Sequence, residues 1–321
     1  MIIDESLSVG YKESMQDRRV VVQVEHLRKL YGSLAAVDDV SFEVREAEIF
    51  GMVGPNGAGK TTTIECIEGL RKPDDGRLSV LDLDPQRDAY LLRPRIGMQL
   101  QESALEERMK VWEALDLFAS FYPRCVDWHP LLEQLGLAEK RNTPFAKLSG
   151  GQQQRLFIGL ALINDPEVVF LDELTTGLDP QARHAIWDMV RGIRERGKTV
   201  VLTTHYMEEA ERLCDRVAIL DHGRIVALDT PPNLIRNLGL EDRIAFSVDQ
   251  SLEVGQLNSI ATVTRVERSN ERVTVHGRGD TFVADVVNAL TAFGIRFRDL
   301  RTEQPNLEDV FLTLTGREMR D

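Results

Sequence analysis

The stretch that decides the fold reads EIFGMVGPNGAGKTTTIECIEGL and covers residues 48–70. Its first part is a short apolar strand, its middle is a glycine-rich turn and its last part is a helix. The turn, GPNGAGKT at 54–61, fits the pattern GxxxxGK[ST] of a phosphate-binding loop, which requires this strand–loop–helix context. Glycines let the backbone wrap closely around phosphates, so that its N–H groups and the helix N-terminus face the negative charge. The stretch therefore predicts nucleotide binding.

Two side chains of this loop have predicted contacts. Lys60 is expected to reach the β- and γ-phosphates of ATP, and the Thr61 hydroxyl to bind Mg²⁺. The alternative is a chance glycine turn, and the strand before it and the helix after it argue against that interpretation. The residues of the loop expected to bind the nucleotide are Gly54, Pro55, Asn56, Gly57, Ala58, Gly59, Lys60, Thr61 and Thr62.

Strands and helices alternate on either side of the loop. Before it, segments 21–27 and 40–46 alternate apolar and polar residues, which predicts half-exposed antiparallel strands joined by a connector at 30–39. The other predicted elements are a helical region at about 105–147, a buried strand at 166–173, a capped helix at 179–197, a buried strand at 198–205 and a hairpin at 216–229. This alternation predicts an α/β domain with a largely parallel sheet.

The pattern changes after Pro231 and Pro232. Short alternating strands and two apolar helix stripes follow in the order strand, weak helix, strand, strand, helix, strand, with a last helix at 307–314. This order is compatible with a small ferredoxin-like α/β sandwich that the last helix closes.

Composition limits the possible partners. The net charge is −13 and the isoelectric point about 5.1, which argues against nucleic acid and against direct docking on anionic lipid. The sequence has no run of ~20 apolar residues, and its polar N-terminus lacks the apolar core of a signal peptide. Cys66, Cys125 and Cys214 lie far apart, as in proteins of a reducing compartment. A cytoplasmic protein is expected, and another protein would have to hold it at any membrane.

Two adjacent acids, Asp172 and Glu173, end the apolar strand VVFLDE. Neighbouring side chains of a strand point in different directions, so the two acids can have different roles. Asp172 is expected to orient the Mg²⁺ shell, and Glu173 to activate the attacking water as general base. Alone, such a pair is more often a helix cap or a solvated turn; downstream of a phosphate loop, the catalytic interpretation is favoured.

The segment LSGGQQQR at 148–155 predicts a second anion-binding turn. Ser149 is a plausible helix N-cap, and Gly150 and Gly151 leave the start of the helix without side chains. A capped helix alone has no use for the two glycines, because glycine costs about 0.8–1.0 kcal/mol relative to alanine in a helix. Close approach to a phosphate would explain them.

Five motifs, GPNGAGKT, LSGGQQQR, VVFLDE, TTGLD and TTH, occur in this order and together resemble the ATP-binding cassette (ABC) ATPase family over residues 20–229. The resemblance implies an α/β P-loop NTPase fold of ABC type, with a parallel-sheet core, antiparallel strands and a helical subdomain, plus a small C-terminal α+β domain. The expected division is a flexible leader at 1–19, the ATPase domain at 20–240 with its helical subdomain at about 102–163, and the C-terminal domain at 241–321.

The resemblance also implies a head-to-tail homodimer or pseudo-dimer. In it, the LSGGQ segment of one subunit closes over ATP held by the phosphate loop of the other. The residues expected to contact the γ-phosphate in trans are Ser149, Gly150, Gly151 and Gln152. Asp179 is expected in the loop that couples the two sites.

Three more residues receive roles through the resemblance. His205 resembles the switch histidine that contacts the γ-phosphate and the catalytic glutamate, although a lone histidine is more often a surface or core residue. Gln101 resembles the glutamine that links Mg²⁺ and the attacking water to the helical subdomain, and Gln99 is the rival in the neighbouring register. Tyr31 resembles the aromatic residue that stacks on adenine; packing on the sheet is its alternative.

One position departs from the family pattern, and the C-terminal segment resembles one group within the family. Leu174 stands where the family usually has proline, so the backbone after Glu173 is expected to be less rigid. The tail PNLEDVFLTLTGRE at 305–318 resembles the C-terminus of ATPases from bacterial drug- and antibiotic-resistance exporters, of the daunorubicin and multidrug-resistance type.

The leading hypothesis is therefore an ATPase subunit at the inner face of the plasma membrane, which drives export through a separate membrane permease. The permease is expected to dock on the region 101–122. A soluble ABC ATPase that acts on a ribosome or another macromolecule is the second hypothesis, and the single cassette and acidic surface argue against it. A nucleotide-gated regulator with little hydrolysis is the third.

Overall fold

The computed structural model describes residues 17–99, 104–239, 241–248 and 254–316. Contacts divide the chain into two units after Pro231, with Pro232–Glu318 as the second unit. The sequence had placed this boundary at 240/241. Residues 231–237 form a helix, α9 (Pro231–Asn237), so the change of pattern noted at the two prolines marks the division more closely than the later boundary did.

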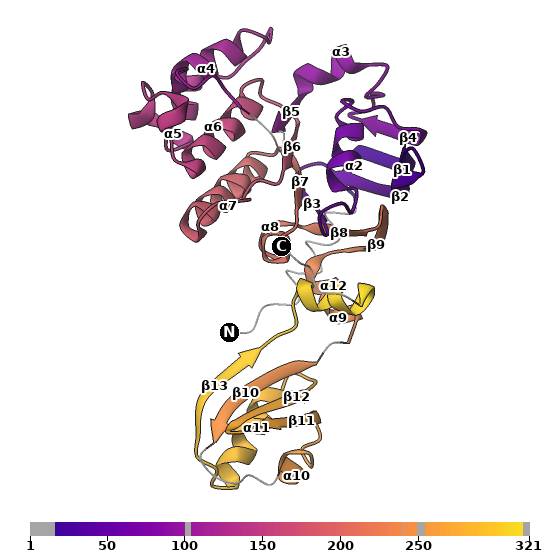
Figure 1. The fold of residues 1–321 in the computed structure, drawn as a ribbon, viewed down its shortest axis with the longest axis vertical. Helices are drawn as coiled ribbons and strands as arrows, with labels where there is room; N and C mark the ends of the chain where they lie inside the picture. Colours follow the sequence, from indigo (N-terminus) through magenta and orange to yellow (C-terminus); the bar gives the residue numbers. More distant parts are fainter. Residues whose placement is uncertain (1–16, 100–103, 240, 249–253, 317–321) are drawn as a thin grey trace. The chain divides into compact units, whose positions relative to one another are not determined.

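A six-stranded sheet forms the centre of the first unit (Figure 1). Its strands, in spatial order, are β5 (Ile96–Gln99), β6 (Val168–Asp172), β7 (Thr199–Thr204), β3 (Ile49–Val53), β8 (Arg216–Asp221) and β9 (Arg224–Asp229). The first five run parallel, and β9 pairs antiparallel with β8 through the predicted hairpin. Strands β3, β6 and β7 are buried along their whole length, as parallel strands covered on both faces must be.

A second, antiparallel sheet has the order β2 (Leu34–Arg45), β1 (Val20–Tyr31), β4 (Asp75–Val80). The predicted connector at 30–39 was wrong. Tyr31 pairs with Leu34, so the turn is only Gly32 and Ser33, and both strands continue through most of that segment. The segment LAAV at 34–37 contains no polar residue, so it can form a strand once the two-residue turn directs the chain back along β1.

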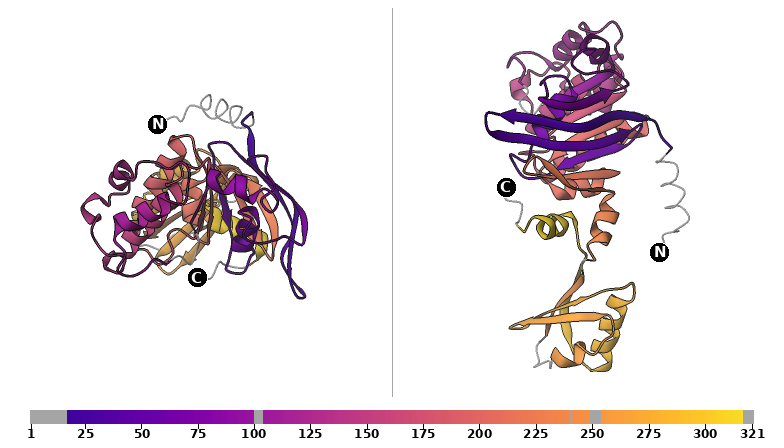
Figure 2. Two further views of the ribbon diagram at one scale, coloured as in Figure 1. Left: turned by 90° about the horizontal axis from the view of Figure 1, so that it is seen from above. Right: turned by 90° about the vertical axis from the view of Figure 1, so that its right-hand side faces the viewer.

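Helix α2 (Lys60–Ile67) lies between the two sheets. Its side chains Ile64, Cys66 and Ile67 belong to the same apolar core as residues of β1, β2, β3 and β6. Figure 2 shows the two long indigo strands β1 and β2 beside the strands of the six-stranded sheet. The helix that follows the phosphate loop is therefore fixed on both sides, and so is the loop itself.

The helical region is less continuous than predicted. Helix covers only α4 (Val111–Ala119) and α5 (Trp128–Gln134) within 105–147, together with two short 3-10 turns. Pro123 and Pro144 interrupt it, since proline lacks the N–H group that a helix interior needs. The remaining helices of the unit are α3 (Ala89–Leu92), α6 (Gly150–Leu162), α7 (Pro180–Glu195) and α8 (Met207–Leu213). Within the described residues, no helix is long and apolar enough to cross a bilayer.

The second unit contains a four-stranded antiparallel sheet. Its spatial order is β11 (Val263–Ser269), β12 (Arg272–Gly277), β10 (Asp242–Val248) and β13 (Phe297–Glu303), with α10 (Val254–Leu257) and α11 (Phe282–Ala292) in the connections. This is the predicted βαββαβ order, and α12 (Leu307–Thr315) follows as the last helix. Its core joins Phe246 and Val275 of the sheet to Phe282 and Val286 of α11.

Candidate functional site

The predicted catalytic residues meet at one edge of the six-stranded sheet. Strands β3, β7 and β6 are neighbours and run parallel, so the segments that follow them leave from the same edge. The phosphate loop follows β3, the acid pair ends β6, and His205 follows β7. The carboxyl edge of a parallel sheet is where ligands bind in open α/β folds.

Two glycines of the phosphate loop, Gly54 and Gly59, are required for steric reasons. A Cβ atom on Gly54 would lie 2.3 Å from the carbonyl oxygen of Leu220, and one on Gly59 would lie 2.4 Å from that of Ala36. Gly59 also has φ +99°, which side chains rarely allow. Lys60 donates to the carbonyl oxygens of Gly54 (2.7 Å) and Pro55 (3.1 Å), so its ammonium group lies inside the loop it follows. Burial lowers the pKa of Lys60, and Glu173 and Asp172 oppose that shift.

The two predicted acids surround this ammonium group. Glu173 Oε1 lies 3.9 Å from Lys60 Nζ, and Asp172 Oδ1 lies 3.5 Å from the Thr61 hydroxyl oxygen. Burial raises the pKa of Asp172, against a hydrogen bond from the Thr203 hydroxyl. Positive charge and hydroxyl donors therefore converge on the acids from the start of α2 and from β7.

Glu173 has an unusual backbone. Its φ is +49°, in the left-handed region, and its N–H donates to the carbonyl and hydroxyl oxygens of Thr203 (3.1 and 3.2 Å). Strained backbone of this kind persists where the surrounding structure holds it, and it concentrates at functional sites. Leu174, at the position of the expected proline, is fully buried, so packing holds the chain here. Whether the turn is less rigid than in relatives with proline stays a prediction.

His205 lies against Glu173. Its Nδ1 is 3.5 Å from Glu173 Oε1, and both side chains are largely buried. The ring also packs on Tyr206, with the ring centres 4.1 Å apart. The structure thus brings together Lys60, Asp172, Glu173 and His205, four residues singled out from three separate motifs.

The second predicted anion turn is built differently. Ser149 caps α6: its hydroxyl accepts from the N–H of Gln152 (3.4 Å), and the Gln152 side chain accepts from the N–H of Ser149 (3.0 Å). A Cβ atom on Gly150 would meet only Leu178, at an ordinary 3.6 Å, whereas one on Gly151 would lie 3.0 Å from Ala182. Ser149 and Gly150 are exposed. The chain's own packing therefore does not require glycine at 150.

Asp179 lies at the start of a helix, and Tyr31 lies at the end of a strand. Asp179 caps α7, and its carboxylate accepts from the N–H of Ala182 at 2.9 Å. This N-cap lies beside the Ser149 turn, because Gly151 approaches Ala182. Tyr31 ends β1, its residue 42% exposed, with the Arg71 guanidinium 5.4 Å from the ring centre. The Lys29 ammonium nitrogen also lies 5.8 Å from the centre of this ring.

Of the two candidate glutamines, only Gln99 lies within the described residues. Gln101 lies outside the described residues. Gln99 ends β5, pairs in register with Leu171 and is buried. The side chain of Gln99 is therefore part of the sheet's interior.

Thr203 and Thr176 complete the site, and the sequence reasoning missed both. Thr203 bridges the Asp172 side chain and the Glu173 backbone, and Thr176 donates to Glu173 Oε2 at 3.3 Å. The available signal was two hydroxyl residues, Thr203 and Thr204, at the end of a buried strand whose middle residues are apolar.

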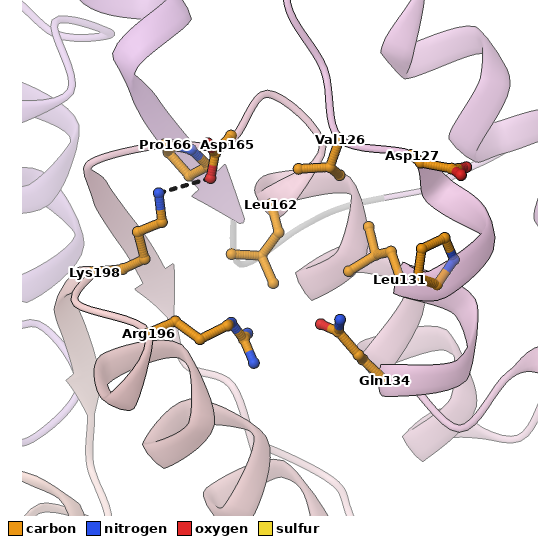
Figure 3. A pocket seen from close by; sticks show the side chains of 10 residues that line it. Val126, Asp127, Leu131, Gln134, Leu162, Asp165, Pro166, Arg196 and Lys198 are labelled. Carbon is orange, nitrogen blue, oxygen red and sulfur yellow. Dashed lines mark hydrogen bonds and ion pairs between the residues drawn. The ribbon is translucent and has the colours of Figure 1, made fainter.

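A pocket of about 440 Å³ lies elsewhere, near the amino ends of β6 and β7 (Figure 3). Leu131 and Leu162 form its apolar wall, and Arg196 points into it from the end of α7. Lys198 and Asp165 form an ion pair at 2.7 Å on its rim. Because Asp165 and Lys198 both lie shortly before the strands β6 and β7, this pocket belongs to the opposite edge of the sheet from the catalytic residues.

Known proteins match the chain along nearly its whole length. The family model described as ABC transporter matches residues 37–176. The Nod factor export ATP-binding protein I of Ralstonia nicotianae is 40% identical over 311 residues, covering 94% of this chain and 95% of the relative. The daunorubicin resistance ATP-binding protein DrrA3 of Streptomyces coeruleorubidus is 37% identical over 308 residues, covering 93% and 97%.

Solved structures match about two thirds of the chain. An ATP-binding subunit of an ABC transporter has a TM-score of 0.62 at 30% identity, covering 68% of this chain and 93% of the other. A dimeric ATP-binding cassette in a post-hydrolysis state with ADP and Pi has a TM-score of 0.57 at 29% identity, covering 65% and 98%. This chain therefore belongs to the ABC transporter family, as one of its ATP-binding, ATP-hydrolysing subunits.

Proposed function

We propose that ATP is hydrolysed at the carboxyl edge of the six-stranded sheet, between the phosphate loop and the pair Glu173 and His205, and that this drives export through a separate membrane permease. The observation that carries the proposal is the convergence of Lys60 Nζ (3.9 Å) and His205 Nδ1 (3.5 Å) on one oxygen of Glu173. The three residues come from segments that are far apart in the sequence. Packing alone would not bring their charged groups together in a largely buried site, because burying charge costs free energy.

The loop binds the triphosphate. Its N–H groups and those at the start of α2 face the phosphates, and the Lys60 ammonium group exchanges its carbonyl partners for phosphate oxygens. Tyr31 stacks on the adenine from the end of β1. The binding residues in this subunit are Gly54, Pro55, Asn56, Gly57, Ala58, Gly59, Lys60, Thr61 and Thr62.

Glu173 acts as the general base. One carboxylate oxygen accepts a proton from the water that attacks the γ-phosphorus, while the Thr176 hydroxyl donates to the carboxylate and Thr203 accepts from the Glu173 backbone N–H. His205 contacts the same carboxylate and the γ-phosphate, so it aligns base and substrate. The low exposure of the pair keeps bulk water from competing with the attacking molecule.

The donor set suits Mg²⁺. Hydroxyl and carboxylate oxygens from Thr61 and Asp172 lie 3.5 Å apart, and hard oxygen ligands are what Mg²⁺ prefers. Within the described residues no group of three or more His, Cys, Asp or Glu could hold a metal unaided, which agrees with a Mg²⁺ ion bound mainly by phosphate oxygens and water. Thr61 and Asp172 would hold the ion, with Gln101 as the predicted third contact. When bound, Mg²⁺ supplies positive charge that stabilises the transferring phosphoryl group.

The second anion turn completes the site of a neighbouring subunit. Ser149, Gly150, Gly151 and Gln152 contact the γ-phosphate of ATP held by the partner, and Asp179 lies in the segment that couples the two sites. The exposure of Ser149 and Gly150, and the absence of any packing need for glycine at 150, support this head-to-tail arrangement. A dimeric cassette among the similar structures agrees with pairing of two copies.

The transported compound passes through another polypeptide. Relatives named for Nod factor export and daunorubicin resistance support export of a drug-like or other substrate, with this subunit on the cytoplasmic face of the plasma membrane. The permease docks on the helical region 101–122, whose described part exposes Leu117 and Phe121. Apolar side chains exposed on one region are typical of an interface.

Fractionation and turnover together test the proposal. The full chain, expressed with its genomic neighbours, should hydrolyse MgATP, sediment with membranes and be released by alkaline carbonate. Sedimentation with ribosomes would favour a soluble ABC ATPase instead. A purified chain that neither binds MgATP nor associates with a membrane subunit would contradict the proposal.

A further inference from the structure

A carboxyl group is fully buried behind the catalytic residues. Glu209 lies in α8, four residues after His205, and has no exposed surface. Its Oε1 accepts from the indole N–H of Trp187 in α7 at 2.9 Å, a bond between two buried side chains. Burial raises the pKa of Glu209, while Thr204, Trp187, Thr175 and Arg183 oppose the rise.

Keeping an acid here costs stability. Removing a carboxyl group from water is costly unless hydrogen bonds replace the lost hydration, and an apolar side chain of similar size would pack here without that cost. One hydrogen bond, from Trp187, does not use both oxygens; Oε2 is buried and makes no full hydrogen bond among the described residues. Stability alone therefore does not account for an acid at this position.

The neighbours of Glu209 belong to the two catalytic turns. Thr204 is the last residue of β7 and comes directly before His205; its hydroxyl also accepts from the N–H of Tyr206 at 2.9 Å. Thr175 is buried and lies two residues after Glu173, near enough to lower the pKa of Glu209. The hydrogen bond between Trp187 and Glu209 joins α7 and α8, the helices that follow the two segments carrying Glu173 and His205.

Helix α7 is the support on which these contacts converge. It provides Trp187, and its Arg183 lies with the guanidinium carbon 4.5 Å from the centre of the Tyr206 ring. Tyr206 in turn packs on His205. Both turns are thus connected to α7: the turn after β6 leads into this helix, and the turn after β7 is held on it through Glu209 and the Arg183–Tyr206 contact.

We propose that Glu209 is a positioning residue, which holds the turns after β6 and β7 on α7 and thereby fixes the 3.5 Å approach of His205 Nδ1 to Glu173 Oε1. The inference rests on the proposed roles of Glu173 and His205. The left-handed backbone of Glu173 needs such support, because strained conformations persist only where their surroundings fix them. Glu209 touches no substrate; it acts through the pair.

Two substitutions of the same residue separate positioning from packing. Glu209→Gln keeps the acceptor for Trp187, and Glu209→Leu keeps a similar volume without any acceptor. In the full chain, Glu209→Leu should lower kcat by between about ten- and a hundredfold with KM for ATP within about threefold of wild type, because the phosphate loop is untouched. Glu209→Gln should retain kcat within about threefold. Glu208→Gln, on the exposed side of the same helix, is the matched control and should leave turnover unchanged.

Trp187→Phe provides a second test if Glu209→Leu does not fold. It removes only the donor, so kcat should fall several-fold with little change of KM, since Glu209 then lacks its link to α7. In a His205→Ala background, Glu209→Leu or Trp187→Phe should cause little further loss, as expected for residues that act through one unit.

The overturning results are specific. A folded Glu209→Leu protein with wild-type kcat contradicts the proposal, as does a loss that adds in full to that of His205→Ala. A rise of KM without a change of kcat would make Glu209 part of nucleotide binding instead. If the wild-type chain hydrolyses no ATP, the proposed site fails, which is a different outcome from a wild-type rate that Glu209→Leu leaves unchanged.

Discussion

The two glycine turns of the first unit share a chemistry and differ in construction. In the phosphate loop, backbone atoms of Leu220 and Ala36 leave no space for a side chain on Gly54 or Gly59, and the Lys60 ammonium group already lies within the loop. At the Ser149 turn, a side chain on Gly150 would meet nothing closer than 3.6 Å. At Gly54 and Gly59 the chain itself occupies the space, whereas at Gly150 it leaves space that it does not fill. This difference is what a ligand held by another subunit would explain.

Glu173→Gln should give the largest effect and isolate the chemistry of the first turn. The amide keeps the shape but cannot accept the proton of water, so kcat for ATP should fall by about 10²–10⁴-fold. Nucleotide affinity should stay within a few-fold, because Lys60 and the loop are intact. Turnover by phosphate release and binding by a fluorescent ATP analogue measure the two. Wild-type turnover in the variant would show that another group is the base.

Glu68→Gln should remove a pH dependence of stability that arises at the end of α2, the helix that follows the first turn. Glu68 follows α2, and burial, aided by the charge of Asp172, raises its pKa to about 8. A raised carboxyl pKa means that the folded state holds a proton that the unfolded state releases above its own pKa near 4.5. The stabilising contribution is therefore present below about pH 4.5 and is lost as pH rises to about 8.

Denaturant titrations of both proteins across that pH range measure this effect. The variant should match wild type near pH 4.5 and exceed its free energy of unfolding by on the order of 3–5 kcal/mol above pH 8. Glu65→Gln, on a half-buried acid paired with Arg71, is the control, and its difference from wild type should lack that slope. A difference between Glu68→Gln and wild type that is constant with pH would contradict the expectation.

Gly59→Ala and Gly150→Ala sharpen the comparison of the turns directly. At Gly59 the new Cβ meets a carbonyl oxygen at 2.4 Å with φ at +99°, so the variant should lose at least about 1–2 kcal/mol of stability and bind ATP weakly. At Gly150 alanine fits the first turn of α6 and should stabilise the fold by up to about 1 kcal/mol. Its hydrolysis should nevertheless fall, because the side chain enters the space proposed for the partner's phosphate. Thermal melts and ATP turnover of both variants measure these effects. A Gly150→Ala protein that hydrolyses ATP like wild type but is less stable would contradict the proposed difference between the two turns.

The sequence predicted those parts of the candidate site that depend only on residues neighbouring in the chain. GPNGAGKT, the acid pair, Ser149 and the Asp179 cap have local signals, because loops, strand ends and caps follow from neighbouring residues. It missed Thr203 and Thr176, whose roles depend on which strands are neighbours, and a sequence alone gives that order only through family resemblance.

The errors in the fold have similar causes. The connector at 30–39 was too long because Ala35 and Ala36 carry no strand pattern of their own and become strand by pairing with β1. The helical region was predicted to be more continuous than it is, because apolar residues keep a helical spacing across Pro123 and Pro144. The bond between Trp187 and Glu209 joins residues 22 positions apart on two helices, and a helix pattern gives no reason to pair them.

The most direct test of the account is complementation between two inactive chains. Lys60→Ala disables the phosphate loop, and Gly150→Ala disables the Ser149 turn; each protein alone should hydrolyse ATP poorly. In a head-to-tail pair of one chain of each kind, the intact loop of one faces the intact turn of the other, so mixing the two should restore ATP hydrolysis well above either alone. Mixed chains that are shown to pair and yet stay as inactive as the separate variants would contradict a site shared between subunits.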